Sequence, residues 1–168
     1  MLVISDTNIL SSLAACDALS PIFRLLQAPI IYIPPTVYQE LHKGLEKGKT
    51  YLNPVFELLA THQIQVIDLL EFEQNMIKSL PNKLNLGERE AIALAKSRQA
   101  LLLCNDKQAI RYCQQQGIES INLPYLLRLF WTRQIFSTAQ VEHLIERMAQ
   151  VENLVLKQTV RAKIFSAL

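Results

Sequence analysis

The chain has 168 residues, of which half are hydrophobic and 19% are charged. A chain of this length and composition can bury a sizeable core, which excludes intrinsic disorder as its main state and indicates one domain, with room for a helical appendage. The 17 basic and 15 acidic residues leave a net charge of +2, too small to indicate nucleic-acid binding from bulk charge, although a local basic rim stays compatible with it.

Three further features of the composition bear on the class of protein. Glycine is scarce, with four residues, which argues against a glycine-rich phosphate-binding loop. Cys16, Cys104 and Cys113 are an odd number without metal-ligand spacing, so we expect reduced, mostly buried thiols. The N-terminus lacks the pattern of a signal peptide, and no apolar run reaches the ~18 residues that span a bilayer. These features predict a cytoplasmic protein without membrane contact.

Short apolar runs alternate along the chain with longer amphipathic stretches. The predicted strands are residues 2–4, 30–33, 64–67, 100–103 and 118–121. The predicted helices are residues 9–15, 22–27, 36–43, 54–61, 72–80, 86–96, 107–116, 125–133, 139–149 and 154–168. We expect Ser20-Pro21 and Ser137 to open two of these helices, and Gly44 and Gly117 to close two others.

This alternation predicts an α/β fold built from βαβ units. Such units form a parallel sheet, here of four or five strands, with helices on both faces and strand 2–4 in its interior. Residues 124–168 contain three predicted helices and no predicted strand. We therefore expect a core of residues 1–123 and a helical C-terminal extension of residues 124–168 packed on it.

Four acidic residues are predicted to meet at the carboxyl edge of this sheet. Asp6 and Asp106 each follow a strand directly, while Glu40 and Glu88 lie on neighbouring helices. Ligands of open parallel sheets bind at this edge. A cation stabilises like charges there, and oxygen ligands without nearby His or Cys favour Mg²⁺ or Mn²⁺. The set predicts an ion that activates water and binds a phosphoryl oxygen, as in phosphodiester hydrolysis.

Each acid, taken singly, also has a simpler interpretation. Asp6 could cap the helix that follows it, although so short a helix makes this the least expected of the caps. Glu88 and Asp106 stand where helix N-termini favour negative charge in any protein. Glu40 could be a solvated residue that pairs with a nearby lysine.

The acids lie in four sequence blocks that resemble the PIN-domain ribonucleases, including the toxins of bacterial toxin–antitoxin pairs. The blocks are residues 3–8 (Val-Ile-Ser-Asp-Thr-Asn), 35–41 (Pro-Thr-Val-Tyr-Gln-Glu-Leu), 86–95 (Leu-Gly-Glu-Arg-Glu-Ala-Ile-Ala-Leu-Ala) and 101–106 (Leu-Leu-Leu-Cys-Asn-Asp). Their order and separation fit the family over about residues 1–123. The third block is typical of a branch of the family in which the third acid is Glu rather than Asp.

The resemblance implies a three-layer α/β fold and an Mg²⁺- or Mn²⁺-dependent ribonuclease that cuts single-stranded RNA. By motif match the catalytic acids are Asp6, Glu40, Glu88 and Asp106. The same match makes Asp6, Glu88 and Asp106 the metal ligands and Asn8 a polar residue that assists the first aspartate. The resemblance further implies an antitoxin protein as a partner, and a homodimer is compatible with the apolar C-terminal helices.

The match departs from the family pattern in the third and fourth blocks. Glu90 lies about 200° around the helix from Glu88, so only one of them can face a metal, and we favour Glu88. Cys104 stands where many relatives have Thr, and Asn105 where some have Asp. These departures leave a second function open: a catalytically degenerate PIN fold that binds RNA or a protein without cutting.

Two other interpretations concern residues near the acids. Lys107 and Arg111 lie four residues apart on one predicted helix face, where they could hold RNA phosphates or form a solvated basic face. A phosphatase with Asp6 as nucleophile is disfavoured, because Asn8 stands where that chemistry needs a second Asp. A phospho-acceptor receiver is disfavoured too, since residues 2–5 contain no acidic pair.

Overall fold

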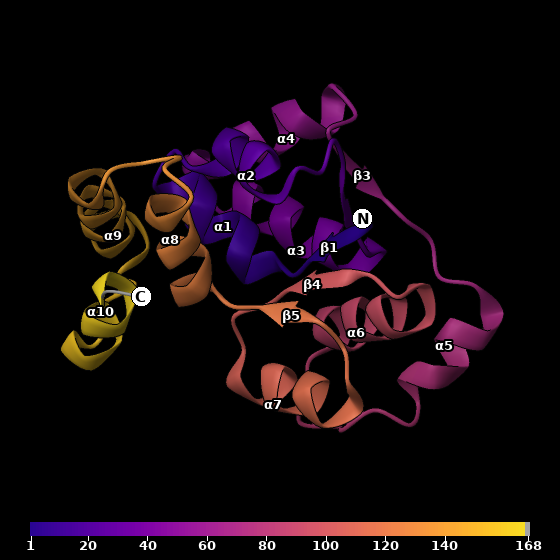
Figure 1. Ribbon diagram of the computed structural model, residues 1–168. Coiled ribbons are helices and arrows are strands. Elements are labelled where there is room, and N and C mark those ends of the chain that lie inside the picture. Colours follow the sequence, from indigo (N-terminus) through magenta and orange to yellow (C-terminus); the bar gives the residue numbers. More distant parts are fainter. Residues whose placement is uncertain (167–168) are drawn as a thin grey trace.

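A parallel five-stranded sheet forms the centre of the computed structural model, which describes residues 1–166 (Figure 1). The strands are β1 (Val3–Ser5), β2 (Ile31–Ile33), β3 (Ile64–Val66), β4 (Leu101–Leu103) and β5 (Ser120–Ile121). Their order is β3-β2-β1-β4-β5, and every neighbouring pair is parallel. The predicted parallel sheet, with the first strand in its interior, is confirmed.

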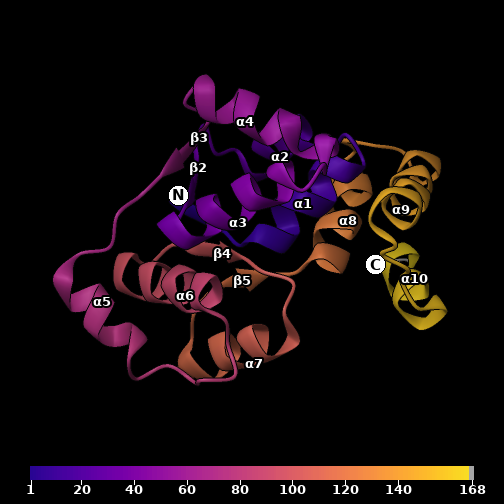
Figure 2. The same cartoon turned by 180° about the vertical axis from the view of Figure 1, so that it is seen from behind.

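Helices cover both faces of the sheet, as Figures 1 and 2 show. In the described part of the chain they are α1 (Thr7–Ala15), α2 (Leu19–Leu26), α3 (Pro35–Glu46), the 3₁₀ helix η1 (Thr50–Leu52), α4 (Asn53–Ala60), α5 (Glu71–Ile77), α6 (Leu86–Arg98), α7 (Lys107–Gln116), α8 (Leu123–Thr132), α9 (Thr138–Glu152) and α10 (Gln158–Phe165). Helices α1 to α4 lie on one side and α5 to α7 on the other, which confirms the three-layer α/β fold.

The two faces of the sheet belong to two separate hydrophobic cores. Val3, Leu101 and Leu103 are buried in the core on the α1 side, whereas Ile4 and Leu102 are buried in the core on the α6 side. Successive side chains of a strand point to opposite faces, so a strand covered on both faces needs an apolar residue at every position. This explains why β4 is apolar throughout and why β1 begins with Val3 and Ile4; its last residue, Ser5, is buried but polar, and its hydroxyl donates a hydrogen bond to the Asp6 carbonyl.

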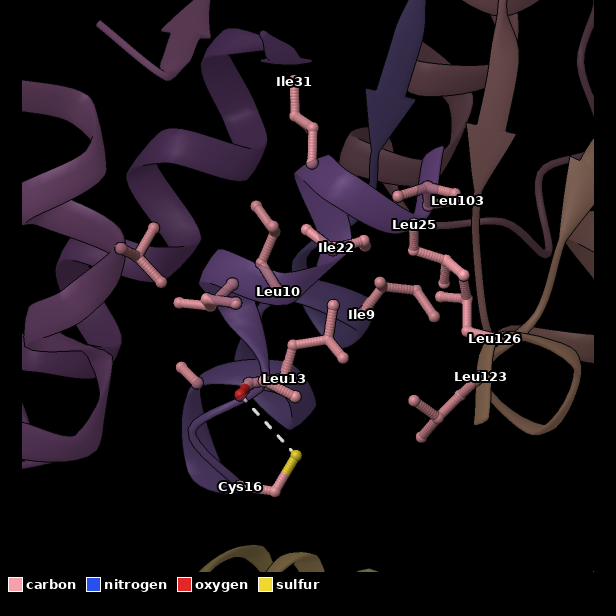
Figure 3. Close-up of a cluster of buried hydrophobic side chains, with 14 of the residues drawn as sticks. Ile9, Leu10, Leu13, Cys16, Ile22, Leu25, Ile31, Leu103, Leu123 and Leu126 are labelled. Carbon is pink, nitrogen blue, oxygen red and sulfur yellow. Dashed lines mark hydrogen bonds between the residues drawn. The ribbon is translucent and has the colours of Figure 1, made fainter. Parts of the chain in front are cut away.

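Helix α1 lies at the centre of the first core (Figure 3). Its side chains Ile9, Leu10 and Leu13 are fully buried. The neighbours that Figure 3 labels around them are Ile22, Leu25, Ile31, Leu103, Leu123 and Leu126. Burying a side chain of this size contributes roughly 1.5–3 kcal/mol. The packing therefore determines where the first turn of α1 lies, and with it the residues that follow β1.

The C-terminal helices pack on the same core, in which Ile145 and Ile164 are buried. Trp131 Nε1 donates a hydrogen bond of 2.8 Å to the carbonyl of Ile164, and the Arg128 guanidinium lies 5.8 Å from the centre of the Trp131 ring. Arg128 also donates to the carbonyl of Lys163, at 2.8 Å. These contacts attach α10 to α8. The division of the chain near residue 124 stays a prediction.

Some predicted helix boundaries are wrong. Helix α2 begins at Leu19, and Pro21 lies inside its first turn, where backbone N–H groups have no partner in the helix. Gly44 does not end α3; it allows Leu52 to approach, since a Cβ on Gly44 would lie 2.8 Å from Leu52 Cδ1. The last helix begins at residue 158 rather than 154, and the end predicted for it lies outside the described residues.

No single helix among the described residues is long and apolar enough to cross a membrane. Helices α1 and α2 reach the required length and composition only as a pair, which is bent by 118°.

A buried ion pair attaches α5 to α6. Glu73 is fully buried, and its carboxylate accepts hydrogen bonds of 2.8 Å from both Nε and Nη2 of Arg98. It also accepts one of 2.7 Å from the backbone N–H of Leu70. The hydrogen bonds from Arg98 lower the pKa of Glu73 from 4.5 to about 2, although burial opposes them.

We expect acid to weaken the fold through Glu73. Since its pKa is lower in the folded than in the unfolded state, the carboxylate stabilises the fold above its unfolded pKa, and this contribution of about 3 kcal/mol disappears as the pH falls through the folded value. In Glu73→Gln this part of the pH dependence should be absent. Urea unfolding of both proteins between about pH 6 and pH 3 measures the difference.

Replacing Arg98, the other partner of the ion pair, should lower the free energy of unfolding more than replacing Glu73 does. Arg98→Met leaves the Glu73 charge buried without its cation, so we expect it to lower the free energy of unfolding by about 3–5 kcal/mol at neutral pH. The same pH dependence in the wild type and in Glu73→Gln would show that the pair does not have this role.

Candidate active site

Asp6 lies directly after β1, and its carboxylate is buried. Oδ1 accepts a hydrogen bond of 2.8 Å from the backbone N–H of Ile9, and Oδ2 accepts one of 3.1 Å from that of Asn105. Asp6 is therefore the N-cap of α1, although the sequence made it the least expected of the caps. No residue separates β1 from α1 except Asp6, so one carboxylate caps the helix while lying at the carboxyl edge of the sheet.

Burial raises the pKa of Asp6 above its ordinary value, and this effect outweighs the hydrogen bonds from Ile9 and Asn105, which lower it. A hydrogen bond with the Cys104 side chain also lowers the pKa, while the nearby Glu40 carboxylate raises it. The protein thus holds Asp6 where a negative charge is unfavourable, and a bound cation would relieve that cost.

Glu40 extends from α3 to the first turns of α1 and α6. Its Oε2 accepts a hydrogen bond from the hydroxyl of Thr7, the residue next to Asp6. The same carboxylate lies against Gly87, where a Cβ would come within 3.2 Å of Glu40 Oε1 and 3.3 Å of Val37 Cγ2. Glycine at position 87 is therefore what allows α6 to approach Glu40 so closely.

Glu88 lies in the first turn of α6 and forms a capping box with Asn85. The backbone N–H of Glu88 donates to Asn85 Oδ1 at 2.8 Å, and the backbone N–H of Asn85 donates to Glu88 Oε2 at 3.0 Å. Burial raises the pKa of Glu88, and the carboxylates of Asp106, Asp6 and Glu40 raise it further. Contacts of Thr7 with Glu40, of Glu40 with Gly87 and of Asn105 with Asp6 place the four predicted acids on adjoining segments, and we call this set the acidic centre.

Asp106, the fourth member, is the N-cap of α7. Its Oδ1 accepts hydrogen bonds of 2.8 Å from the backbone N–H groups of Gln108 and Ala109. Asn105, which precedes it, has its own side-chain oxygen bonded to the backbone N–H of Leu123 at 3.3 Å. The loop after β4 is thereby attached to the start of α8, and Asp106 is held at the edge of the sheet.

The Glu90 side chain binds the N-terminus of α3 rather than the acidic centre. Its carboxylate accepts hydrogen bonds from the backbone N–H and the hydroxyl of Thr36, at 3.0 and 2.8 Å. These bonds place a negative charge at the N-terminus of α3, whose N-cap is Pro34 and has no side-chain acceptor. The geometry agrees with the preference for Glu88, because Glu90 has a structural partner outside the acidic centre.

The charges of the acidic centre have no basic partner among the ion pairs of residues 1–166. Those ion pairs join Glu46 to His42, Glu73 to Arg98 and Asp17 to Arg147. Carboxylates that repel one another without a basic counter-charge suit a hard divalent cation. The donor chemistry of the centre therefore fits Mg²⁺ or Mn²⁺.

The acidic side chains of residues 1–166 are not arranged to bind a bare metal ion directly. Within the described part of the chain, no group of three or more His, Cys, Asp or Glu side chains is arranged to hold a metal ion by itself. Mg²⁺ usually keeps several waters and binds one or two carboxylates directly, so the centre fits a hydrated ion. The ligand set Asp6, Glu88 and Asp106 stays a prediction.

The predicted substrate-binding residues lie on the two helices that Asp6 and Asp106 cap. Asn8 is exposed in the first turn of α1, two residues after Asp6. Lys107 and Arg111 are exposed on α7, the helix that Asp106 caps. Their positions allow contact with a ligand at this edge of the sheet, and their roles stay predictions.

Sequence reasoning missed two residues near the centre. Thr7 lies inside the first matched block, and its hydroxyl group next to Asp6 could have indicated that it binds another acid of the site. Glu152, at the end of α9, accepts a hydrogen bond of 2.8 Å from Ser12 of α1, 140 residues away along the chain. No spacing in the sequence could have indicated that contact.

An α/β fold with an acidic centre at the carboxyl edge of a parallel sheet is the class of protein that these observations define. A family model described as a PIN domain matches residues 2–168, and the chain belongs to the PIN-domain family. PIN domains are generally nucleases, and PIN nucleases generally use divalent metal ions. The match includes the C-terminal helices, which the four blocks did not reach. A comparison with curated proteins gave no match.

The contact between Gly87 and Glu40 can be tested by Gly87→Ala. Alanine in a helix is more favourable than glycine by up to about 1 kcal/mol. Here the added methyl group would lie 3.2 Å from Glu40 Oε1 and 3.3 Å from Val37 Cγ2, so we expect that gain to be lost or reversed. The free energy of unfolding in urea measures the effect.

A double-mutant cycle supplies the control. In a Glu40→Ala background the carboxylate is gone, so Gly87→Ala should be better tolerated there than in the wild type. Strictly additive effects of the two substitutions would show that the contact is not the cause.

Proposed function

We propose that the protein is a metal-dependent ribonuclease that hydrolyses phosphodiester bonds within single-stranded RNA. One observation carries the proposal: contacts of Thr7 with Glu40, of Glu40 with Gly87 and of Asn105 with Asp6 bring four carboxylates to the ligand-binding edge of a parallel sheet, where the other three raise the pKa of the buried Glu88. Such crowding is unfavourable without a cation, and the chain belongs to a family of nucleases. We further propose that the protein acts as a toxin in the cytoplasm, with an antitoxin protein as partner.

In this proposal Asp6, Glu88 and Asp106 hold Mg²⁺ or Mn²⁺. The bound ion would supply an activated water and a positive charge for a phosphoryl oxygen. Asp6 is oriented for this role by the backbone N–H groups of Ile9 and Asn105, and its burial excludes competing solvent. The protein thus positions its first ligand before any ion arrives.

Glu40 and the exposed polar residues have other tasks in the same proposal. The Thr7 hydroxyl holds Glu40 Oε2, so Oε1 is the atom that orients the attacking water and takes its proton. Asn8, Lys107 and Arg111 hold the RNA strand, the last two as cations for its phosphates. Asn8 and Lys107 lie in the first turns of α1 and α7, while Glu40 and Arg111 lie in the second turns of α3 and α7.

A second candidate function is a PIN fold that binds RNA or a protein without cutting. The observation in its favour is that three of the four acids have a structural role in capping helices. Asp6 caps α1, Glu88 belongs to the capping box of α6, and Asp106 caps α7. These roles would preserve the acids even in a protein without activity.

The substitution Asp6→Asn separates the two candidates. Asparagine caps a helix about as well as aspartate, so its oxygen can still accept from Ile9, but the charge of a metal ligand and the acceptor for the Asn105 N–H are lost. Burial raises the pKa of Asp6, so its negative charge is unfavourable in the fold at neutral pH and we expect the variant to fold. We expect cleavage of a single-stranded RNA with Mn²⁺ to be abolished, as it is for the wild type in EDTA.

Glu90→Gln is the matched control, because it removes a carboxylate of the same helix that is bonded to Thr36 outside the centre. It should affect cleavage far less. Unchanged cleavage by Asp6→Asn would place the activity at another site or in a contaminant, and no cleavage by the wild type with any divalent ion would favour the binding module.

Metal binding should also be visible without RNA. An ion that binds only the folded protein stabilises it by RT ln(1 + [L]/Kd), about 2.7 kcal/mol at a hundredfold excess over Kd. We expect Mn²⁺ to raise the Tm of the wild type and of Glu90→Gln, but not of Asp6→Asn. Because the pKa values of Asp6 and Glu88 are raised, protons should compete with the ion and the shift should shrink as the pH is lowered.

A further inference from the structure

We infer that a polar pocket beside the acidic centre binds the nucleotide next to the scissile bond of an RNA strand. The inference rests on the proposed ribonuclease function and adds a site to it. The pocket has a volume of about 590 Å³. Its polar lining is Asn8, Ser12, Lys49, Tyr51, Asn105, Glu152 and Asn153. We call it the α1 pocket, since it lies along that helix.

The α1 pocket adjoins the acidic centre at one end, since two of its lining residues are next to Asp6 in the sequence or in space. Asn8 follows Asp6 by two positions, in the same turn of α1. The backbone N–H of Asn105 donates to Asp6 Oδ2 at 3.1 Å, and Asn105 is also a lining residue of the pocket. A strand whose phosphate lies at Asp6 can therefore place an adjacent nucleotide in the pocket.

The C-terminal helices complete the far wall of the pocket. Glu152 of α9 accepts hydrogen bonds from the hydroxyls of Ser11 and Ser12 on α1, the latter at 2.8 Å. It also accepts one of 3.4 Å from the hydroxyl of Tyr51 on η1. Figures 1 and 2 both show α9 on the side of the molecule where α1 lies. One carboxylate thus joins three segments, so the wall and Tyr51 are fixed before a ligand binds.

The chemistry of the lining points to a nucleotide. Proteins hold unpaired RNA bases by stacking on aromatic side chains and by hydrogen bonds to polar groups, and they hold phosphates with cations. Tyr51 is an aromatic residue of partial exposure, Asn8 and Asn105 offer amides, and Lys49 is an exposed cation. Lys47 lies on the same turn, which Gly48 makes possible with a φ of 89°. The volume suits one small ligand rather than a protein segment.

Each residue has a distinct role in this inference. Lys49 binds a backbone phosphate, and the ring of Tyr51 contacts the base. Glu152 is a positioning residue that holds Tyr51. The pocket therefore contributes to substrate binding, whereas the chemistry stays with the acidic centre.

Binding of a labelled single-stranded oligoribonucleotide in EDTA, followed by fluorescence anisotropy, tests the pocket without any cleavage. Lys49→Gln should weaken binding and reduce the slope of log K against log salt by about 0.7, the value for one phosphate contact on a single strand. Lys96→Gln is the matched control, because Lys96 lies near the end of α6, at the opposite edge of the sheet, and it should change neither quantity.

Tyr51 allows a second matched comparison. Tyr51→Leu should weaken binding by about tenfold, within the range for losing one stacked base. Tyr51→Phe keeps the ring but loses the hydrogen bond to Glu152, so it should weaken binding less than Tyr51→Leu does. Glu152→Gln should raise KM for cleavage in Mn²⁺ with kcat nearly unchanged, whereas a purely structural role would lower the fraction of active protein and leave KM alone.

The outcomes separate the pocket from the nuclease proposal. RNA binding that depends on Lys49 and Tyr51, without cleavage in Mn²⁺, would support the pocket and overturn the ribonuclease. Cleavage in Mn²⁺ with RNA binding and KM unchanged in Lys49→Gln and Tyr51→Leu would overturn the pocket and leave the ribonuclease standing. Because Lys49 is exposed, its replacement tests the pocket even if Tyr51→Leu does not fold.

Discussion

The direct junction between β1 and α1 is the constraint on which the rest of the structure depends. Asp6 is the single residue between the two elements, and its carboxylate is bonded both to the first turn of α1 and to the loop after β4. Because α1 is buried among α2, β4 and α8, the junction cannot shift without disturbing the first core. A carboxylate is thereby kept in surroundings that favour its neutral form.

The other acids reach the same place by different physical means. Glu40 depends on a glycine at position 87 that lets two helices approach closely, and on the hydroxyl of Thr7. Glu88 and Asp106 are positioned by capping, in which the unpaired N–H groups of a helix end bind a carboxylate. Capping and metal binding are compatible, because a carboxylate has about four lone-pair directions and a cap uses only one or two of them.

The C-terminal helices are part of the same arrangement rather than a separate attachment. Their apolar residues complete the first core, and Trp131 is used inside the fold to hold α10. The carboxylate of Glu152 brings the end of α9 to α1 and η1, beside the acidic centre. In this protein the helices after β5 therefore shape the surface next to the site as well as stabilising the sheet.

Much of the fold was determined by local patterns in the sequence. The apolar runs of β1 and β4 specify strands covered on both faces, and Gly117 ends α7 where a left-handed residue was expected, with a φ of 68°. The order of acids after strands was enough to predict which edge of the sheet they share, because all parallel strands end on the same side. These features depend on periodicity and on backbone geometry, which neighbouring residues decide.

Only the tertiary structure decided the rest. Gly44 lies inside α3, where it leaves room for Leu52 to approach. Glu90 binds the N-terminus of α3 because Thr36 lies within hydrogen-bond distance of its carboxylate. The contact of Glu152 with Ser12 joins residues 140 positions apart. Such contacts depend on how whole elements pack, and packing is set by the combined shape of two cores rather than by the spacing of residues along the chain.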